Sequence, residues 1–285
     1  MKFPNFSHAR PGSVREAIEL LAQNEDARPL AGGQSLLPIL ALRLASPSQL
    51  VDLNGIEELA RIEVRDGYLK IGAMVTHARN AQSPENKKHL PLLVEALQHV
   101  AHEAVRNRGT LGGSLANADA SAEMPLIMVA LAAKLVLTSL EGERSVTAED
   151  FFQGHYTTAI QPGELLTSIE IPFPDLSWAF EEVARRPGDF ALGMVAVGVR
   201  TREGHCDAAR IVLGCVGDKP LRAPEAEAFL LNKRLDSDVI NEAAAVAIQT
   251  IKARTDIHAS AEYRRSLTGV LVRRALTRAT QGGSK

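Results

Sequence analysis

Cysteine is scarce in this sequence of 285 residues, which contains only Cys206 and Cys215. An iron–sulfur cluster usually takes four thiolate ligands, and a zinc site built from cysteine needs nearly as many. The chain therefore cannot hold either kind of centre on its own cysteines. A low cysteine count is also usual in a reducing compartment, so we expect a cytoplasmic protein.

Long apolar runs and charge of one sign are absent as well. No stretch approaches the ~20 apolar residues that span a bilayer, and the N-terminus lacks the apolar run of a signal peptide. Lys and Arg together number 32 and Asp and Glu together 34, which gives a formal net charge of −2. With no basic stripe in this balance, we expect neither nucleic-acid binding nor a membrane span.

Two common nucleotide-binding motifs are missing. No Gly-x-Gly-x-x-Gly follows a strand, and no Gly-x-x-x-x-Gly-Lys-Ser/Thr is present, so neither a Rossmann nor a P-loop site is predicted. Any nucleotide must be held by a different kind of loop. The hydrophobic content of 45% and charged content of 23% are otherwise ordinary for a globular enzyme of this length.

Two loops rich in small residues stand out among the features that are present. The first reads Leu30-Ala31-Gly32-Gly33-Gln34-Ser35-Leu36 and follows a short apolar strand. The second spans Arg108–Glu123 between two apolar segments, and its core reads Thr110-Leu111-Gly112-Gly113-Ser114. Because glycine has no Cβ, each pair can adopt positive φ and let a bound group reach backbone N–H donors.

Short polar side chains accompany the second glycine pair. Thr110, Ser114 and Asn117 add hydrogen-bonding groups there, and this mixture suits a pyrophosphate or a polyol chain. A single glycine pair is common in surface turns and would predict little alone. Two cradles of the same design favour a dinucleotide ligand.

Hydrophobic periodicity predicts both helices and strands. Ser13 and Glu16 form a capping box ahead of an amphipathic helix, and Asp66-Gly67 is a hairpin signal between two apolar runs. The predicted helices span 14–23, 92–109, 125–133, 147–152, 224–231, 238–253 and 260–280. The predicted strands span 28–31, 49–53, 62–64, 68–74, 134–140, 165–171, 178–185, 192–201 and 206–213.

A proline pair divides the chain into two regions. Pro172-Phe173-Pro174 ends the strand at 165–171, and we place a domain boundary near residue 175. The first region, 1–175, begins as a β-α-β unit and then turns antiparallel, which gives subdomains of about 1–54 and 55–175. The second region, 176–285, holds three antiparallel strands followed by helices. No long Pro/Gly-rich linker separates them, so an α+β chain with packed domains is predicted.

Taken with their flanks, these motifs resemble the FAD-binding (medium) subunit of the molybdenum hydroxylases. This family includes carbon monoxide dehydrogenase, xanthine dehydrogenase and bacterial dehydrogenases of N-heteroaromatic compounds, and the medium subunits of quinoline oxidoreductases look most similar. The resemblance covers nearly the whole chain, and the segments that carry it are 1–4, 31–37, 110–123, 164–172 and 185–191.

The resemblance implies a fold, a cofactor and partners. The fold would be a vanillyl-alcohol-oxidase-like (PCMH-type) FAD-binding domain of two α/β subdomains. A C-terminal antiparallel sheet-and-helix domain, like that of the carbon monoxide dehydrogenase flavoprotein, would close over the flavin. The sequence offers no clear anchor for covalent flavin attachment, so we expect FAD to be held without a covalent bond. An iron–sulfur small subunit and a molybdopterin-binding large subunit would carry the [2Fe-2S] clusters and the molybdenum cofactor, in an (αβγ)2 heterohexamer.

The resemblance also implies which residues hold FAD. The loop Ala31–Ser35, with Leu30 and Leu36 beside it, would wrap the pyrophosphate with backbone amides. The loop Thr110–Ser114, Leu111 included, would run alongside it toward the flavin. Asn117, Asp119 and Glu123 would bind ribityl or ribose hydroxyl groups, of which Glu123 aligns with the family's acidic ligand. Helix capping is the alternative for these three residues, because acidic groups favour a helix N-terminus.

Further cofactor contacts are implied outside the two loops. Thr76 would approach the flavin or the adenine. Leu166 aligns with a family residue whose backbone meets the flavin, although a place in the strand core is an equal alternative. The segment 185–191 matches a family segment whose tyrosine covers one flavin face. Phe190 stands there, between Asp189 and Ala191, and keeps a ring for stacking without the hydroxyl.

Charged residues near that segment admit two interpretations. Arg185 and Arg186 would steady a reduced flavin or a nucleotide, or would be solvated surface charges. A lysine that lies near the flavin in some relatives is replaced here by Glu181 or Glu182. For His77, His99 and His102 we expect surface or satisfied polar roles, because no metal-ligand or Ser-His-Asp spacing is visible.

The function implied is electron transfer from partner iron–sulfur clusters through FAD to an external acceptor. Neither a catalytic residue nor a metal ligand is expected in this chain. Two alternatives stay open on the residues alone: a self-contained FAD-dependent oxidoreductase with its own substrate pocket, and a non-catalytic nucleotide-binding scaffold.

Overall fold

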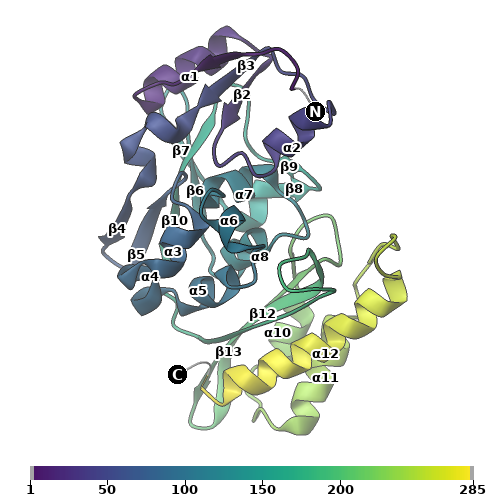
Figure 1. Cartoon of the computed structure of the whole chain (residues 1–285). Helices are drawn as coiled ribbons and strands as arrows, with labels where there is room; N and C mark the ends of the chain where they lie inside the picture. Colours follow the sequence, from purple (N-terminus) through teal and green to yellow (C-terminus); the bar gives the residue numbers. More distant parts are fainter. Residues whose placement is uncertain (1–2, 283–285) are drawn as a thin grey trace.

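A β-α-β unit opens the fold in the computed structural model of the chain, which describes residues 3–282 (Figure 1). The first two residues of the 1–4 segment therefore lie outside the described residues. The helix α1 (Val14–Gln23) begins where the capping box predicts, since the Ser13 hydroxyl accepts the Glu16 N–H at 3.2 Å. The strands β1 (Ser7–Ala9), β3 (Gln49–Asp52) and β2 (Ala27–Leu30) form a parallel sheet in that order, and α2 (Leu36–Ala41) follows β2.

A five-stranded antiparallel sheet forms the body of the first domain. Its order is β4-β5-β10-β6-β7, and the predicted hairpin joins the first two strands at Gly67, whose φ is +83°. The strands span Ile62–Arg65 (β4), Tyr68–Gly72 (β5), Leu165–Pro172 (β10), Lys134–Thr138 (β6) and Glu143–Thr147 (β7). The edge strand β7 escapes the sequence pattern because its residues are mostly polar and exposed.

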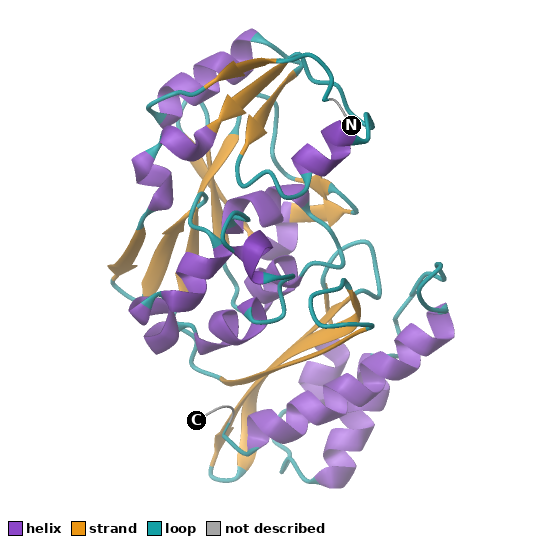
Figure 2. Cartoon of the chain, viewed as in Figure 1, coloured by secondary structure: helices purple, strands orange, loops and turns teal. Residues whose placement is uncertain are grey.

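Short helices cover this sheet (Figure 2). They are α3 (His77–Gln82), α4 (Pro84–His89), α5 (Pro91–Leu97), α6 (Glu103–Arg106), α7 (Leu111–Asn117), α8 (Glu123–Ala130) and α9 (Ala148–Phe151). Small elements complete the domain: the 3-10 turns η1 (Leu53–Gly55) and η2 (Glu57–Ala60) and the hairpin of β8 (Phe152–Gly154) and β9 (Thr157–Thr158).

The single helix predicted over 92–109 is wrong. The chain leaves helical geometry after α5, passes through Ala101 at a φ of +41°, and resumes as α6. Arg106 stabilises this turn, because its guanidinium donates to the carbonyl oxygens of Val100 and Ala101 at 2.8 and 2.7 Å. The apolar spacing continues across the break, which is why periodicity alone did not reveal it.

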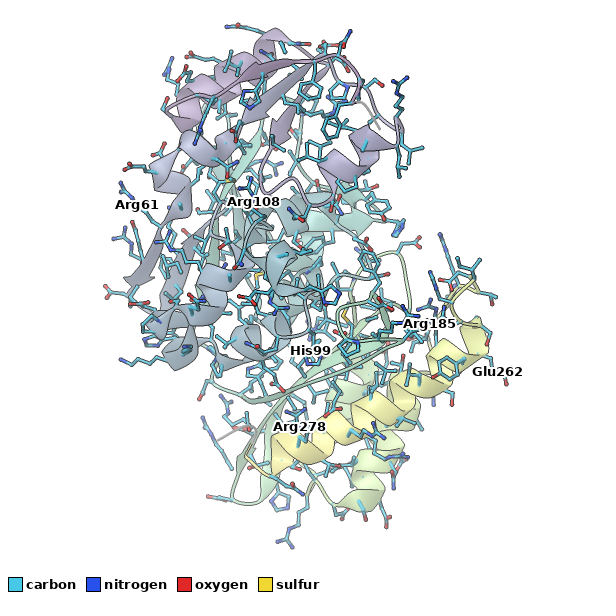
Figure 3. The ribbon with its side chains drawn as sticks, in the orientation of Figure 1. Arg61, His99, Arg108, Arg185, Glu262 and Arg278 are labelled. Atoms are coloured by element: carbon cyan, nitrogen blue, oxygen red, sulfur yellow. The ribbon has the colours of Figure 1, made fainter. Side chains whose placement is uncertain are left out.

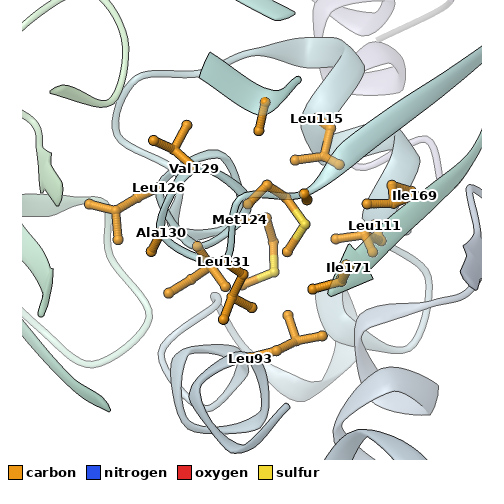
Figure 4. Close-up of a cluster of buried hydrophobic side chains, with 14 of the residues drawn as sticks. Leu93, Leu111, Leu115, Met124, Leu126, Val129, Ala130, Leu131, Ile169 and Ile171 are labelled. Carbon is orange, nitrogen blue, oxygen red and sulfur yellow. The ribbon is translucent and has the colours of Figure 1, made fainter. Parts of the chain in front are cut away.

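Helix α8 is the centre of the first core. Every residue of Glu123–Ala130 is buried, and apolar side chains from α5, α7 and β10 pack around it (Figure 4). The residues labelled around it are Leu93, Leu111, Leu115, Ile169 and Ile171. A helix buried on all sides fits its uniformly apolar sequence after Glu123.

The C-terminal domain is an antiparallel sheet with helices on one face. Its strands run in the order β11 (Ser177–Ala184), β12 (Ala191–Arg202), β13 (His205–Gly214) and β14 (Leu221–Arg222). The helices are α10 (Pro224–Leu230), α11 (Ser237–Ala247) and α12 (Ala261–Thr280). Of these, α11 ends six positions before the predicted 253. The predicted α+β class agrees with this content of helix and sheet.

Strand alternation makes the C-terminal sheet serve two cores. Trp178, Phe180, Met194 and Ala196 face the α8 core, while Ala179 and its neighbours on β12 face α10–α12. Side chains on successive strand positions point to opposite faces, so this one sheet joins the two domains. The domains are packed together as predicted, and among residues 3–282 no helix is long and apolar enough to cross a membrane.

Candidate cofactor-binding site

The first glycine loop directly follows β2 and exposes a row of backbone donors. The N–H groups of Gly32, Gly33, Gln34 and Ser35 donate to no protein acceptor within residues 3–282. Gly33 has a φ of +72°, as predicted for a glycine of a cradle. Successive free N–H groups around a left-handed residue form a concave site for an anion, and the diphosphate of a dinucleotide is such an anion.

Protein donors occupy the carbonyl groups of this loop. Asn54, which follows β3, donates through its side-chain amide to the Ala31 oxygen at 3.1 Å, and the Gln34 amide donates to the Gly32 oxygen at 3.2 Å. The Gly33 oxygen accepts the Leu37 N–H at 3.1 Å. The free polar groups that the loop backbone presents are therefore mainly donors, which suits a negatively charged ligand.

The second glycine loop differs from the prediction. Its residues Leu111–Asn117 form helix α7, and neither Gly112 nor Gly113 has a positive φ. Their amides are occupied: Gly112 donates to the Ala73 oxygen at 2.9 Å, and Gly113 donates to the Thr110 hydroxyl at 3.0 Å. The expected row of free amides at this loop is therefore wrong, because the helix and its cap use them.

The second glycine pair instead permits close packing. A Cβ on Gly112 would lie 2.4 Å from the Ala73 Cβ and 2.7 Å from the Ala73 oxygen. A Cβ on Gly113 would lie 2.8 Å from the Thr110 hydroxyl and 3.3 Å from the Ala31 Cβ, so α7 abuts the first loop. The side chains of Ser114 and Asn117 are half-buried on this helix.

Gly32 is where the two loops meet. A Cβ built there would lie 2.1 Å from the Arg108 oxygen and 2.8 Å from the Gly109 Cα. The two predicted loops, separated by about 80 positions in the sequence, are thus in backbone contact. This contact brings the free N–H row of the first loop next to the start of α7.

Thr76 belongs to the same junction. It forms an isolated antiparallel bridge with Thr110, and each threonine caps its own helix by accepting a backbone N–H, from Arg79 and Gly113 respectively. The neighbouring His77 N–H donates to the Gly109 oxygen at 2.9 Å. Thr76 is therefore a positioning element of the second loop, with its hydroxyl already bonded.

The predicted apolar contacts divide into two groups. Leu111 is fully buried and Leu166 is 4% exposed, and both side chains lie in the first core. Only their backbone can meet a ligand. Leu30 and Leu36 are half-buried at the two ends of the first loop, so part of each side chain is exposed and can contact a ligand.

Asp119 lies just after the end of α7, next to Ala118, whose φ is +49°. One Asp119 oxygen accepts the Ser121 N–H at 2.8 Å, and the other accepts the Tyr156 hydroxyl at 3.2 Å. The N-cap of α8 is Ala122, which makes no side-chain cap. The capping alternative is therefore wrong for Asn117 and Asp119. Tyr156 also belongs to the site through its bond to Asp119. No local sequence pattern indicates this contact, because the two residues are 37 positions apart.

Glu123 is the first residue of α8 and is 7% exposed. The pKa of its carboxyl is raised to about 7. Burial is the largest cause, a hydrogen bond from its own N–H lowers the pKa, and the negative charge of Asp119 raises it. A buried carboxyl without a cation can exchange hydrogen bonds with ligand hydroxyl groups, as the resemblance implies for this residue.

The structure separates Glu181 from Glu182. Glu181 accepts from Arg278 of α12 at 2.7 Å, on the helix-covered face of β11. Glu182 points the opposite way, toward the first domain, with its side chain 4% exposed. His99, labelled in Figure 3, lies between the two domains on this side, and its ring packs edge-on against Phe180 at 5.1 Å.

The segment 185–191 forms the turn between β11 and β12. Gly188, at a φ of +82°, packs on the Ala101–His102 turn, since a Cβ there would lie 2.8 Å from the His102 ring. Phe190 is 69% exposed, and Arg185 and Asp189 are exposed beside it. Arg185 makes no ion pair within residues 3–282, so its side chain is free for an anionic ligand (Figure 3).

One histidine departs from the expected surface or satisfied role. His77 is 4% exposed, and its Nδ1 has no hydrogen-bond partner within the described part of the chain. Burial, and then the charge of Arg106, lower its pKa to about 4, so the ring is neutral. His77 packs against Gly109 and fills the space behind the second loop. Across residues 3–282 no group of three His, Cys, Asp or Glu is placed to hold a metal ion.

Two family models match successive parts of the chain. Residues 4–174 match the FAD binding domain in molybdopterin dehydrogenase, and residues 178–279 match the CO dehydrogenase flavoprotein C-terminal domain. Among curated relatives, the nicotine 6-hydroxylase medium subunit of Paenarthrobacter nicotinovorans is 41% identical over 279 residues, covering 98% of this chain and 99% of that protein. The carbon monoxide dehydrogenase medium chain of Afipia carboxidovorans is 41% identical, with 96% of each chain covered.

The fold is also that of solved structures. Quinoline 2-oxidoreductase from Pseudomonas putida 86 contains a chain with a TM-score of 0.97 and 50% identity, covering 99% of both chains. A carbon monoxide dehydrogenase chain from Hydrogenophaga pseudoflava matches with a TM-score of 0.96 and 38% identity over 100% of both. These matches confirm the predicted FAD-binding and C-terminal folds. The chain therefore belongs to the FAD-binding medium subunits of the molybdenum hydroxylases.

Proposed function

We propose that this chain holds one FAD, without a covalent bond, across the junction of its two glycine loops, and that it passes electrons to an external acceptor. The observation that carries the proposal is the backbone contact at Gly32, which sets a row of four free N–H groups beside the start of α7. A diphosphate accepts hydrogen bonds from such a row at little reorganisation cost.

The remaining candidate residues then have roles that follow from their chemistry. Ser114, Asn117, Asp119 and Glu123 bind hydroxyl groups of the cofactor, because each offers a polar side chain on the exit side of the junction. Leu30 and Leu36 contact it through apolar surface, while Thr76, Thr110, Leu111 and Leu166 hold the two loops in place. Phe190, Arg185 and Asp189 approach from the C-terminal domain. FAD, when bound, supplies the ability to accept two electrons.

The source of those electrons lies outside this chain. Cys206 and Cys215 are free thiols and cannot ligate an iron–sulfur cluster, and residues 3–282 present no metal-binding group. Relatives of this chain are named as medium subunits or chains of larger enzymes. We infer an iron–sulfur small subunit and a molybdopterin-binding large subunit as partners, doubled into an (αβγ)2 heterohexamer.

The substrate of the complete enzyme is inferred from the relatives. Nicotine 6-hydroxylase and quinoline 2-oxidoreductase are named for N-heteroaromatic compounds, and we infer a compound of that class.

Two free thiols favour a cytoplasmic location. We place the FAD-binding domain at 1–175, with subdomains of about 1–54 and 55–175, and the C-terminal domain at 176–285; the parallel sheet, the five-stranded sheet and the C-terminal four-stranded sheet support this division.

Release of the cofactor tests this proposal. Purified chain is precipitated by heat, and the supernatant is analysed for FAD by absorbance and mass spectrometry. One FAD per chain in the supernatant is expected. Colourless protein would favour the scaffold alternative, and flavin retained in the precipitate would contradict non-covalent binding. Reduction of the isolated chain by an N-heteroaromatic substrate would instead favour a self-contained oxidoreductase.

A further inference from the structure

Glu182 is a buried carboxyl that forms no ion pair with a Lys or Arg side chain of residues 3–282. Its side chain is 4% exposed, and its Oε2 has no hydrogen-bond partner within residues 3–282. Its other oxygen lies 3.8 Å from the His99 Nδ1, which is too long for a hydrogen bond. Burial lowers the pKa of His99; the charges of Glu95 and Glu181 raise it and that of Arg278 lowers it, so the net shift disfavours a charged ring beside Glu182.

The nearby arginines are committed elsewhere. Arg264 of α12 donates to the Leu192 oxygen and to Asp256, each at 2.7 Å. Arg278 of α12 donates to Glu181 and to Glu95 of α5, at 2.7 and 2.6 Å. Neither arginine forms an ion pair with Glu182.

The acidic groups close to Glu182 come from α8 and from the turn before it. Burial, and then the charge of Glu123, raise the pKa of Glu182 to about 8. Glu123 responds in the same direction, and Asp119 acts on it from the end of α7. Burial raises the pKa of the Cys215 thiol, the charge of Arg264 lowers it, and the charges of Glu182, Glu123 and Asp119 raise it further, so the thiol stays uncharged. Two buried carboxyls that repel each other hold their protons at neutral pH more readily than one alone.

This pair sits where the proposed cofactor site meets the C-terminal domain. Glu123 is a candidate cofactor ligand, and Glu182 is three positions before Arg185, at the start of the turn that carries Phe190. An unpartnered carboxyl that is almost wholly buried is costly to keep unless a ligand or a proton satisfies it.

We propose that Glu182 and Glu123 act as a proton-accepting carboxyl pair, which binds one proton from solvent when the bound flavin receives two electrons. This inference rests on the proposed FAD site. The electrons come from the partner's clusters, or from a chemical reductant in the test. The proton adds to a carboxylate oxygen and converts it to a carboxylic acid, and no bond in the protein breaks.

The reason is electrostatic. Added electrons make the cofactor cavity more negative, and in a buried site this charge raises the pKa of nearby carboxyls. A pair that is partly ionised near pH 7 to 8 then takes up a proton and reduces the repulsion. For a two-electron couple, one extra proton makes the midpoint potential fall by a further ~30 mV per pH unit, since a tenfold change in equilibrium constant corresponds to 29.6 mV.

Potentiometry on the full chain loaded with FAD tests the pair. Midpoint potentials are measured anaerobically between about pH 6 and 9, a range that brackets both raised pKa values. Wild type is compared with Glu182→Gln, which keeps the shape and cannot ionise. The control is Glu181→Gln, the adjacent position whose side chain faces α12. We expect a steeper pH dependence in wild type and in the control than in Glu182→Gln, by up to the ~30 mV per pH unit of one proton.

Proton uptake provides the second measurement and needs no variant. A pH indicator in weak buffer reports the protons taken up when dithionite reduces the FAD-loaded chain, with free FAD as reference. More protons per FAD in the chain than in solution supports the pair, and equal numbers contradict it. Equal potential slopes in wild type and Glu182→Gln would overturn the inference while leaving the FAD proposal intact. A chain that binds no FAD would instead refute the proposed function itself.

Discussion

Gly32→Ala is the substitution that most directly tests the junction of the two loops. The added Cβ would lie 2.1 Å from the Arg108 oxygen and 2.8 Å from both the Arg108 carbonyl carbon and the Gly109 Cα. Ordinary contact begins at 3.4 Å, so the first distance must open by more than 1 Å. All three atoms are backbone atoms, which cannot move aside by a change of rotamer. The loops must therefore separate, and the free N–H row moves away from α7.

The size of the effect follows from two terms. Overpacking of this kind costs about 1–3 kcal/mol of folding stability. A charge-assisted hydrogen bond to phosphate contributes about 1.5–3 kcal/mol, so the loss of even one weakens FAD binding by about 10- to 150-fold. We expect a folded chain of reduced stability whose dissociation constant for FAD rises by at least this factor.

Flavin fluorescence titration and chemical denaturation measure the two terms separately. Gly67→Ala is the matched control, because this substitution also adds one Cβ. The new Cβ meets nothing within 4 Å, and the φ of Gly67 is +83°. That control should lose about 1–2 kcal/mol through left-handed strain and bind FAD normally. Wild-type FAD affinity in Gly32→Ala would refute the argument that contact between the loops forms the site.

Two other substitutions test neighbouring features. Gly113→Val places a Cβ 2.8 Å from the Thr110 hydroxyl and disrupts the α7 cap, so we expect a loss of about 1 kcal/mol or more of stability together with weakened FAD binding. Unchanged affinity by the same titration would count against a role for α7. Glu182→Gln should change the pH dependence of stability in the chain without FAD. The pKa of Glu182 is raised to about 8 in the folded chain, so its contribution is full below the ordinary pKa of a glutamate and is lost as pH rises to about 8, at about 1.4 kcal/mol per pH unit. Thermal denaturation should show that the stability of the variant rises relative to that of wild type at pH 8 to 9 and not at pH 5. A stability difference that stays constant across this range would contradict the assignment.

Local sequence patterns predicted much of the fold. The capping box of α1 and the hairpin at Gly67 depend on residues a few positions apart, and both appear where expected. Strands were also predicted at 178–185 and 192–201, and the structure places both in the C-terminal sheet, whose two faces are buried against different cores. The break at Ala101 could not be predicted in this way, since it depends on Arg106 bonding two carbonyl groups of the turn.

The candidate site was predicted in its parts more than in its arrangement. Both glycine loops contribute to the junction, but only Gly33 uses the left-handed backbone that glycine permits. Gly112 and Gly113 are required for packing inside a helix, and a run of small residues does not distinguish that use from a flexible loop. Tyr156 bonds to Asp119, and Glu123 acts electrostatically on Glu182. Both interactions join segments that are distant in the sequence, so local sequence patterns could not predict them.

We infer that this chain carries electrons on FAD and depends on partner subunits to supply them. The measurement is anaerobic absorbance of the flavin when an N-heteroaromatic substrate is added, first to the FAD-loaded chain alone and then with the iron–sulfur and molybdopterin subunits present. Dithionite serves as the control that the flavin is reducible. We predict no bleaching by substrate in the isolated chain and full bleaching once both partners are present. Bleaching by substrate in the isolated chain would contradict the account.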